Sequence, residues 1–324
     1  MGTPLFAAVL SVSSLKEARH FYEGALGFNA SAVQMHSGDI FERYWRLPCG
    51  SSAKSISFSM NNEAVGRVVT MEFHVPYRQV IPQPGDRTYI GLWNLNFYVD
   101  DIYSSTESLQ KNGYRFWSEP ILYQVSAEAG QPIEVLFDGP DGLAINLVQL
   151  TGGGDTVIGR LKERVSKAGK TMKGYSPVST TSHSVDCYLP VRQFYEEVLG
   201  LKVFIDDTLD KEETNYFLRR PRTARTRATF LENSSPYGKI ALSYPLNYEV
   251  PDRRQLQVPP NIGYVAQSFI VQDIEEAVFL CNTMAISIYS GPLTILLPDI
   301  GLRKSVIVHS PGSGALIQLI SELV

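Results

Sequence analysis

The sequence has 324 residues, which at about 150 residues per domain predicts roughly two domains. Hydrophobic residues make up 44% of it and charged residues 19%, the composition of an ordinary globular protein with a sizeable core. The 29 basic and 33 acidic residues leave a net charge of −4. A general nucleic-acid binder, or a protein that binds anionic membranes, would have a clear excess of basic residues, so this balance argues against both classes.

Three features of the sequence predict a cytoplasmic location and no membrane partner. No apolar run approaches the roughly 18 residues that cross a bilayer. Residues 1–14 lack the positively charged start of a signal peptide. The three cysteines, Cys49, Cys187 and Cys281, are scattered without CxxC spacing, which is typical of reduced thiols.

In chain order, the first half alternates expected strands with two helices. The Ser14–Glu17 capping pattern opens the first helix, and Asp101 opens the second. Glycines end both helices. The expected elements are a strand at 7–11, a helix at 14–27, strands at 69–75 and 93–99, a helix at 101–113 and a strand at 144–148.

The segment after these elements begins with three glycines and carries six basic side chains. A solvated helical linker is favoured over a basic docking segment. The second half then repeats the strand and helix pattern, with an expected strand at 181–187 and a helical face at i, i+3, i+4, i+7 and i+8 from Val191. Asp273 with Glu276 opens its second helix, and 314–322 is the last strand.

Several short segments recur at one nearly constant offset. FYEGALGF at 21–28 recurs as FYEEVLGL at 194–201, an offset of 173. FYVDDI at 97–102 recurs as FIVQDI at 269–274, an offset of 172. The two halves are therefore expected to be copies, each split into two βαβββ units. The predicted organisation is a first module at 1–151, a linker at 152–177 and a second module at 178–324.

These segments, together with GPDGLAINL at 139–147 and SPGSGALIQL at 310–319, resemble the vicinal oxygen chelate superfamily, also called the glyoxalase/bleomycin resistance/dioxygenase superfamily. The resemblance covers nearly the whole chain outside the linker. It implies an α+β fold of two tandem glyoxalase-like modules. Each would be a pair of βαβββ units that form a curved mixed sheet, with helices outside and a pocket on the concave side. Many members of the superfamily hold a divalent metal in that pocket.

Period-two alternation assigns the polar side chains of the first half to one strand face. The apolar residues between them are expected to pack on the helices. The predicted cavity residues are Thr70, Glu72, His74, Asn94, Asn96, Tyr98 and Asn146. Glu72 and His74 lie two residues apart, about 7 Å along one strand face, and are candidates for a catalytic acid and base. The three asparagines and Tyr98 are candidates for binding substrate oxygens.

The second half offers a less polar set of cavity residues. His183, on the expected strand at 181–187, is a candidate catalytic residue, and a hydrogen-bonded structural histidine is the alternative. The repeat matches Gln267 to Asn94 and Gln318 to Asn146. Both glutamines are therefore candidate substrate-binding amides.

The resemblance implies metal ligands at four strand positions in each module. These positions carry Ala7, Glu72, Asn94 and Asn146 in the first half, and His183, Ala241, Gln267 and Gln318 in the second. A divalent metal usually takes several histidine or carboxylate ligands, and each half offers one. Pairing the units across the halves does not improve the set. We expect no metal and no other cofactor, with a divalent metal as the disfavoured alternative.

Three functions are compatible with these residues. The first is a metal-independent isomerase, lyase or cyclase that uses acid-base chemistry on a small cyclic or polyketide-like metabolite. The second is a non-enzymatic protein that binds a drug or metabolite. The third is a metal-dependent lyase or ring-cleaving dioxygenase. In each case the partner is a small molecule, and tandem modules allow either a monomer or a homodimer.

Overall fold

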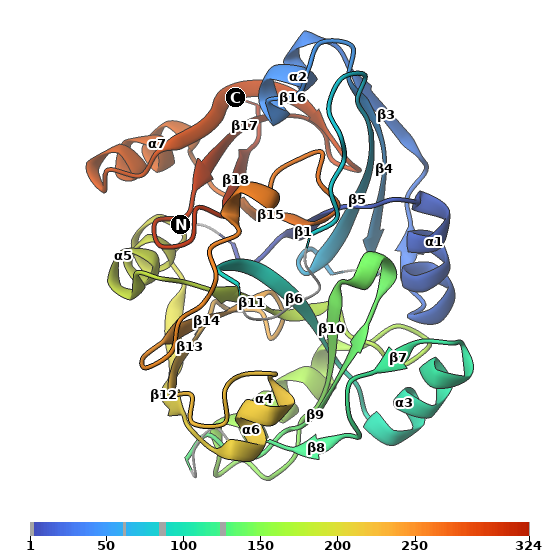
Figure 1. Ribbon diagram of the computed structural model, residues 1–324, viewed down its shortest axis with the longest axis vertical. Coiled ribbons are helices and arrows are strands. Elements are labelled where there is room, and N and C mark those ends of the chain that lie inside the picture. Colours follow the sequence, from blue (N-terminus) through green and yellow to red (C-terminus); the bar gives the residue numbers. More distant parts are fainter. Residues whose placement is uncertain (1–2, 61–62, 84–88, 124–127, 324) are drawn as a thin grey trace.

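The computed structural model describes residues 3–60, 63–83, 89–123 and 128–323. Its strands and helices form four βαβββ units (Figure 1). The first unit contains β1 (Ala7–Ser11), α1 (Leu15–Arg19), η1 (His20–Ala25), β2 (Asn29–Ala30), β3 (Gln34–Ser37), α2 (Asp39–Trp45), β4 (Ser52–Ser59) and β5 (Arg67–His74). The second contains β6 (Gly91–Tyr98), α3 (Ile102–Lys111), β7 (Arg115–Phe116), β8 (Ile121–Leu122), β9 (Ile133–Asp138), η2 (Pro140–Gly142) and β10 (Ala144–Gln149).

The second half repeats this arrangement after a connecting helix, α4 (Val157–Ala168). The third unit contains β11 (Val178–Ser184), α5 (Tyr188–Gln193), η3 (Phe194–Val198), β12 (Lys202–Leu209), α6 (Glu212–Phe217), β13 (Thr226–Glu232) and β14 (Lys239–Pro245). The fourth follows the short turn η4 (Arg254–Leu256) and contains β15 (Gly263–Ile270), α7 (Ile274–Thr283), β16 (Ile288–Leu297), β17 (Gly301–His309) and β18 (Leu316–Ser321). The α+β fold with tandem glyoxalase-like modules is confirmed.

The predicted caps form as expected, and the repeated FY segments wind differently from a plain α-helix. The Ser14 side chain accepts a hydrogen bond from the Glu17 N–H, and Asp101 and Asp273 cap α3 and α7 in the same way. From His20 onward the first helix becomes a π-helix, in which the Leu26 N–H donates to the Phe21 carbonyl five residues earlier. The segment η3 repeats this π turn in the third unit.

The sheets combine units from opposite halves of the chain. One sheet has the order β16-β17-β18-β15-β1-β5-β4-β2 and joins the fourth unit to the first. The other has the order β12-β13-β14-β11-β6-β10-β9-β7 and joins the third unit to the second. We call these the 1–4 sheet and the 2–3 sheet. At each centre two first strands run antiparallel, β1 beside β15 and β6 beside β11. The expectation that each module forms a sheet of its own is wrong: the modules 1–151 and 178–324 are units of repetition, and each sheet takes one unit from each.

A closed ring of backbone hydrogen bonds joins the two sheets. The Leu5 N–H donates to the Gly238 carbonyl, Gly238 to Val178, Val178 to Gly66, and Gly66 back to Leu5, with N···O distances of 2.9–3.0 Å. Leu5 and Val178 are equivalent in the repeat, as are Gly66 and Gly238. The ring therefore has the twofold character of the duplication, and it holds the starts of strands from both sheets together.

Each concave sheet face is closed by helices. The apolar core of the 1–4 face includes Phe41, Tyr44 and Trp45 of α2. The core of the 2–3 face includes Ile158, Leu161 and Val165 of α4 and residues of α6. The segment expected to be a solvated linker thus also packs its apolar side into a sheet. The outer faces and the remaining helices form one large central core.

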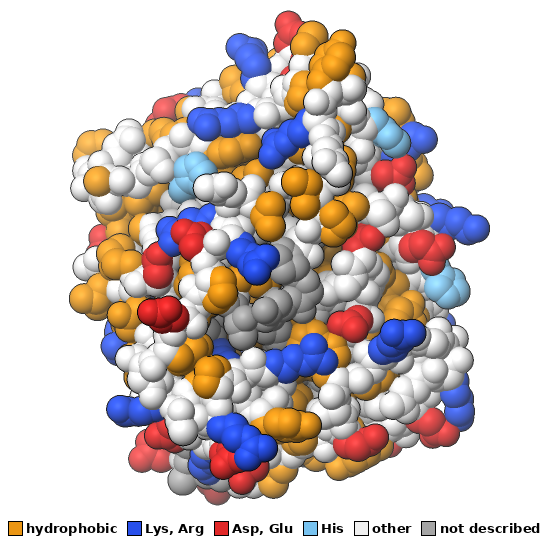
Figure 2. Space-filling model, in the orientation of Figure 1, with side chains coloured by type: hydrophobic (Ala, Val, Ile, Leu, Met, Phe, Trp, Pro, Cys, Tyr) orange, Lys and Arg blue, Asp and Glu red, His pale blue; other side chains and the backbone are white. Residues whose placement is uncertain are grey.

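The exposed charges are mixed. On the face shown in Figure 2, Lys and Arg side chains are interspersed with Asp and Glu. None of the helices in the described part of the chain is long and apolar enough to cross a membrane.

Candidate functional site

The concave face of the 2–3 sheet encloses a cavity with a polar floor. Its volume is about 50 Å³, which holds a few water molecules or a ligand of a few non-hydrogen atoms. Its polar lining consists of Asn96, Tyr98, Glu134, Thr180 and Lys239. The apolar and aromatic walls come from β10, β12, β13, α4 and the segment between β8 and β9, and include Tyr123, Val148, Ile158, Phe204 and Phe230.

The asparagines predicted for this face do lie on it and are held by hydrogen bonds. The Asn94 side-chain amide donates to Asn96 Oδ1 at 2.7 Å, and Asn94 Oδ1 accepts from the Ser182 N–H of β11 at 3.0 Å. Asn146 Nδ2 donates to Glu134 Oε2 at 2.8 Å. Asn94 therefore ties β6 to β11, while Asn96 and Asn146 present amide groups beside the cavity. Tyr98 is on the same face, and burial raises the pKa of its hydroxyl.

Lys239 and Glu134 are ionisable residues of this cavity that the sequence analysis missed. The side chain of Lys239 is 1% exposed, the residue pairs with Thr180 in the register of β14 and β11, and its Nζ lies 5.2 Å from the centre of the Tyr98 ring. Burial lowers the pKa of the amine to about 7. Nζ donates to the Pro236 carbonyl. Ala241 lies two residues further along the strand and was already assigned to the cavity face. Because residues two apart on a strand share a face, the same alternation could have identified Lys239 as a cavity residue.

The concave face of the 1–4 sheet is mainly apolar. Its cavity is about 20 Å³ and is lined by Val9, Val69, Met71, Phe41, Trp45 and neighbouring side chains, with His36, Ser268 and Gln318 as polar members. Gln318 faces this cavity, as predicted, and Nε2 donates to the Tyr44 hydroxyl at 2.8 Å. The Tyr44 hydroxyl lies 2.6 Å from Ser305 Oγ. Gln318 is thus part of a small hydrogen-bonded cluster at the floor.

The predicted orientation of β5 is wrong. Val69, Met71 and Phe73 face the 1–4 cavity, and Glu72 and His74 lie on the outer face. Glu72 Oε2 accepts from the Leu15 N–H at the start of α1 at 2.9 Å, while its other oxygen lies 3.5 Å from the half-exposed His74 ring. Both faces of this strand are covered, so hydrophobicity alone does not identify the cavity side. The pair stabilises a helix start rather than lining a pocket.

His183 and Gln267 lie between the sheets, in the central core, and not in either cavity. His183 Nδ1 is 3.0 Å from the Tyr195 hydroxyl, which donates to Gln267 Oε1 at 2.6 Å. His183 Nε2 contacts the Ser313 hydroxyl. Burial lowers the pKa of His183 to about 3, which keeps the ring neutral. The predicted placement of His183 and Gln267 in a cavity is wrong. A shift of one residue along a strand reverses the face, and the neighbouring Ser182 and Ser268 face the cavities instead.

The donor atoms of both cavities do not match those that a divalent metal prefers. The 2–3 face presents amides, hydroxyls, the single carboxylate of Glu134 and the Lys239 amine, whose cationic form repels a metal ion. The 1–4 face presents one histidine, His36, with Ser268 and Gln318 beside the thioether of Met71. Across the described ranges, no cluster of three or more His, Cys, Asp or Glu side chains could hold an ion. We derive no chemistry through a metal.

Comparison with known proteins identifies the family of the first half. Residues 5–147 match the model of the Glyoxalase/Bleomycin resistance protein/Dioxygenase superfamily. The second half repeats this region at the offset of 172–173, in the same βαβββ units. The first half of the chain thus matches this superfamily. Among curated proteins, none matches the sequence.

Solved structures of this superfamily share the fold over the full length of the chain. Glyoxalase I from Zea mays is 16% identical, with a TM-score of 0.62 over 99% of this chain and 92% of the other. A proposed dioxygenase from Bacillus subtilis is 13% identical, with a TM-score of 0.57 over 100% of this chain and 86% of the other. At such identities the likeness establishes the architecture of this chain, and the reaction has to be argued from its own residues.

Proposed function

We propose that the chain is a metal-independent enzyme that carries out acid-base chemistry on a small molecule in the 2–3 cavity, as an isomerase, lyase or cyclase. The observation that carries the proposal is the buried amine of Lys239, with a pKa of about 7, in a cavity that it shares with Glu134 and two amide-bearing strands. Near neutral pH such an amine is divided between its basic and acidic forms, which suits proton transfer.

The residues of the 2–3 cavity divide the work between binding and proton transfer. Asn96 and Thr180 are donors for a carbonyl or hydroxyl oxygen of the substrate. Neutral Lys239 accepts a proton from a carbon or hydroxyl next to that oxygen and, once protonated, returns it at another position. Glu134, oriented by Asn146, is the second group that exchanges protons with the bound molecule. The cavity volume restricts this geometry to a compact substrate or a compact reacting part of a larger one.

The test measures proton abstraction without knowing the natural substrate. Protein freed of metals with a chelator is incubated in D2O with a panel of small oxo compounds (pyruvate, oxaloacetate and methylglyoxal), and deuterium uptake next to the carbonyl is followed by NMR. We expect enzyme-dependent exchange with at least one compound, rising with pH through about 7, and at least a tenfold loss in Lys239→Met. The matched control Lys202→Met changes an exposed lysine of β12 and should exchange like the wild type. Exchange in none of the compounds, or equal exchange in Lys239→Met, contradicts the proposal.

A second candidate function rests on the 1–4 cavity. Its apolar walls, with Phe41, Trp45 and Met71, suit a flat apolar ligand, as in a protein that binds a drug or metabolite without converting it. Stoichiometric binding without turnover, lost in Met71→Arg and retained in Lys239→Met, favours this function over the first. A metal-dependent lyase or dioxygenase is the third, and elemental analysis of the purified protein tests it.

The proposal also covers partners and location. The partner is a small molecule, since the mixed surface charge gives no basic patch to a nucleic acid on the face of Figure 2. One chain supplies the paired units of both cavities, which makes a monomer sufficient. Cys49 and Cys187 are exposed free thiols and Cys281 a buried one, which agrees with work in the reducing cytoplasm.

A further inference from the structure

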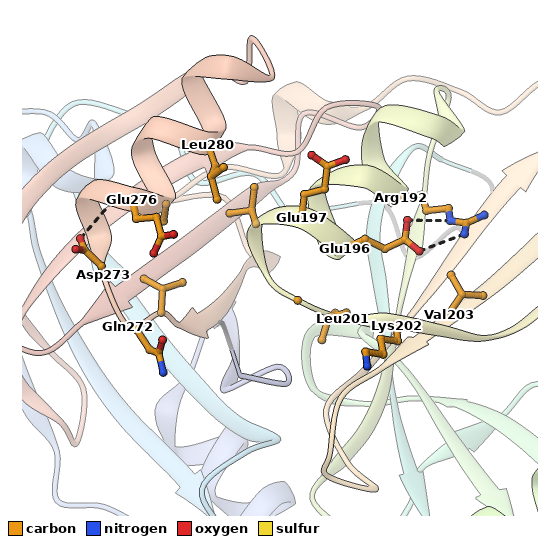
Figure 3. A pocket seen from close by; sticks show the side chains of 14 residues that line it. Arg192, Glu196, Glu197, Leu201, Lys202, Val203, Gln272, Asp273, Glu276 and Leu280 are labelled. Atoms are coloured by element: carbon orange, nitrogen blue, oxygen red, sulfur yellow. Dashed lines mark hydrogen bonds and ion pairs between the residues drawn. The ribbon is translucent and has the colours of Figure 1, made fainter.

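A wide groove runs between the helices of the third and fourth units. It lies between η3 and α7, on the left of Figure 1, and has a volume of about 680 Å³. Its floor is apolar, with Val198, Leu201, Val271, Ala277 and Leu280. Figure 3 shows carboxylates on its two sides: Glu196 and Glu197 from η3, and Glu276 of α7 with Asp273, the N-cap residue of that helix. Arg192, which pairs with Glu196 at 3.1 Å, and Lys202 are the basic residues that line it.

The equivalent groove of the first half is partly covered by the chain itself. There the connection after α4 forms a turn, in which the Thr171 N–H donates to the Tyr175 carbonyl and the Gly174 N–H to the Thr171 carbonyl, and it lies against η1 and α3. Thr171 Oγ1 donates to the Leu26 carbonyl at 2.7 Å, and Lys173 Nζ donates to the Gly24 carbonyl. Lys170 Nζ pairs with Asp100 at 2.5 Å. Tyr175, 4% exposed, closes the groove, and the remaining volume is about 450 Å³.

The repeat relates the two grooves residue by residue. Adding 173 carries Gly24 and Ala25 to Glu197 and Val198, and adding 172 carries Ser104, Ser105 and Ser108 to Glu276, Ala277 and Leu280. Both sets line their grooves. The second-half positions are more acidic and more apolar than their first-half counterparts. They therefore suit a segment that is basic and carries an apolar anchor.

The covering segment has a partial counterpart in the second half. The Ser176 N–H donates to the Tyr98 carbonyl at the end of β6, and the Thr3 N–H donates to the equivalent Ile270 carbonyl at the end of β15. Thr3 thus takes the place of Ser176. In the part of the chain that the structure describes, all residues that line the second groove come from 192–203 and 271–280. No described segment lies where 170–175 lies in the first half.

We propose that this groove is a docking site for a basic peptide segment of a partner protein, with lysines that meet Glu197 and Glu276 and an apolar anchor that packs on Val198, Ala277 and Leu280. In the first half, the turn at residues 171–175 shows that a segment with lysine side chains lies in a groove of this kind. Charge complementarity favours a basic partner segment, because the groove is lined by four carboxylates and two cations.

The test uses a fluorescent synthetic peptide with the sequence of residues 168–177, AGKTMKGYSP, and the full-length protein. We expect saturable one-to-one binding in fluorescence anisotropy that weakens as salt is raised. The double variant Glu197→Lys/Glu276→Lys should weaken binding at least tenfold. The control Glu213→Lys changes an exposed glutamate of α6, outside the groove, and should bind like the wild type. Both variants change exposed side chains, and circular dichroism confirms their folding.

NMR chemical-shift changes locate the binding site independently of the variants. Shifts confined to 192–203 and 271–280 support the proposal. Absence of saturable binding up to 1 mM peptide in a wild type at low salt overturns it, as does equal binding by the double variant or a shift map outside the groove. None of these readouts depends on enzyme activity, so the result is separate from the fate of the proposed function.

Discussion

The hydroxyl of Tyr195 holds the ring of His183 in one tautomer. The Tyr195 hydroxyl has a single hydrogen, which it gives to Gln267 Oε1 at 2.6 Å. It therefore accepts from the His183 Nδ1–H at 3.0 Å, and the bare Nε2 accepts from Ser313. This chain of hydrogen bonds connects β11, η3, β15 and the loop before β18. His183, a candidate catalytic residue in the sequence analysis, is thus a neutral, hydrogen-bonded structural residue of the central core.

The first prediction concerns acid stability. His183 stays neutral in the folded chain down to a pKa of about 3, whereas in the unfolded chain it takes up a proton below about 6.5. The unfolded state therefore binds more protons between these values, and stability falls as pH falls through this window, by up to ~1.4 kcal/mol per pH unit. In His183→Gln this contribution should vanish between pH 7 and 5 in urea denaturation. The control is His20→Gln, which changes an exposed ring and should retain the slope.

The second prediction concerns the cost of the buried amine. Lys239 has its pKa lowered from 10.5 to about 7, so the folded state binds fewer protons than the unfolded state between these pH values. Its contribution to stability is most unfavourable below pH 7 and is relieved as pH rises to about 10.5. Lys239→Met should therefore stabilise the chain at pH 6, on the order of 2–4 kcal/mol, and the gain should shrink at pH 9. Chemical denaturation at both pH values measures it, and a destabilised Lys239→Met at pH 6 contradicts the assigned burial.

The third prediction separates Glu72 from catalysis. Its carboxylate caps the first turn of α1 through the Leu15 N–H, so Glu72→Gln should cost about 0.5–1 kcal/mol of stability. The half-exposed His74 should tolerate replacement by alanine within about 0.5 kcal/mol. Urea denaturation measures both. In the deuterium-exchange assay both variants should match the wild type, and loss of exchange in either would return the pair to the active site.

The fourth prediction concerns the backbone ring at the junction of the sheets. Gly66 and Gly238 both have a φ of 70°, and an added Cβ would lie 2.7 Å from the Val178 carbonyl oxygen and 2.9 Å from the Leu5 carbonyl oxygen. Gly66→Ala and Gly238→Ala should each destabilise the chain by about 2 kcal/mol or more, because the obstacle is backbone. Gly113→Ala is the control, since its φ is also positive and nothing lies near its Cβ. Thermal unfolding should show a larger loss in the first two variants than in the control.

The repeat, the caps and the strand faces with clear alternation could be predicted from the sequence. On β6 apolar residues alternate with Asn94, Asn96 and Tyr98 from Trp93 onward, and Asn94 and Asn96 lie where this pattern places them. Both faces of β5 are covered by other parts of the protein, so the alternation does not show which face lines the cavity, and Glu72 was assigned to the wrong one. On β15 the offset changes from 173 to 172, so the match for Asn94 is Ala266, not Gln267.

Two further features depend on tertiary contacts. The first is the pairing of the βαβββ units into sheets. The repeat is compatible with pairing within a half or across the halves, and the sequence does not indicate which of the two occurs. The connections before β6 and β15 lie side by side, with the Ile90 N–H bonded to Pro251 and the Gln83 N–H bonded to Ile262. The lowered pKa of Lys239 also depends on tertiary contacts. It results from burial of the amine in the closed 2–3 cavity, and the mixed polar and apolar sequence of β14 does not indicate that burial.

Because each sheet takes one unit from each half, the halves are interdependent even though they are copies. A fragment of residues 1–151 holds half of two sheets and exposes the pairing edges of β1 and β6, which β15 and β11 cover in the intact chain. Cleavage between the halves would therefore leave two fragments that remain associated through both sheets and the backbone ring. The duplicated chain is in effect a covalent dimer whose interface is its core, and it should lose its structure in one cooperative step.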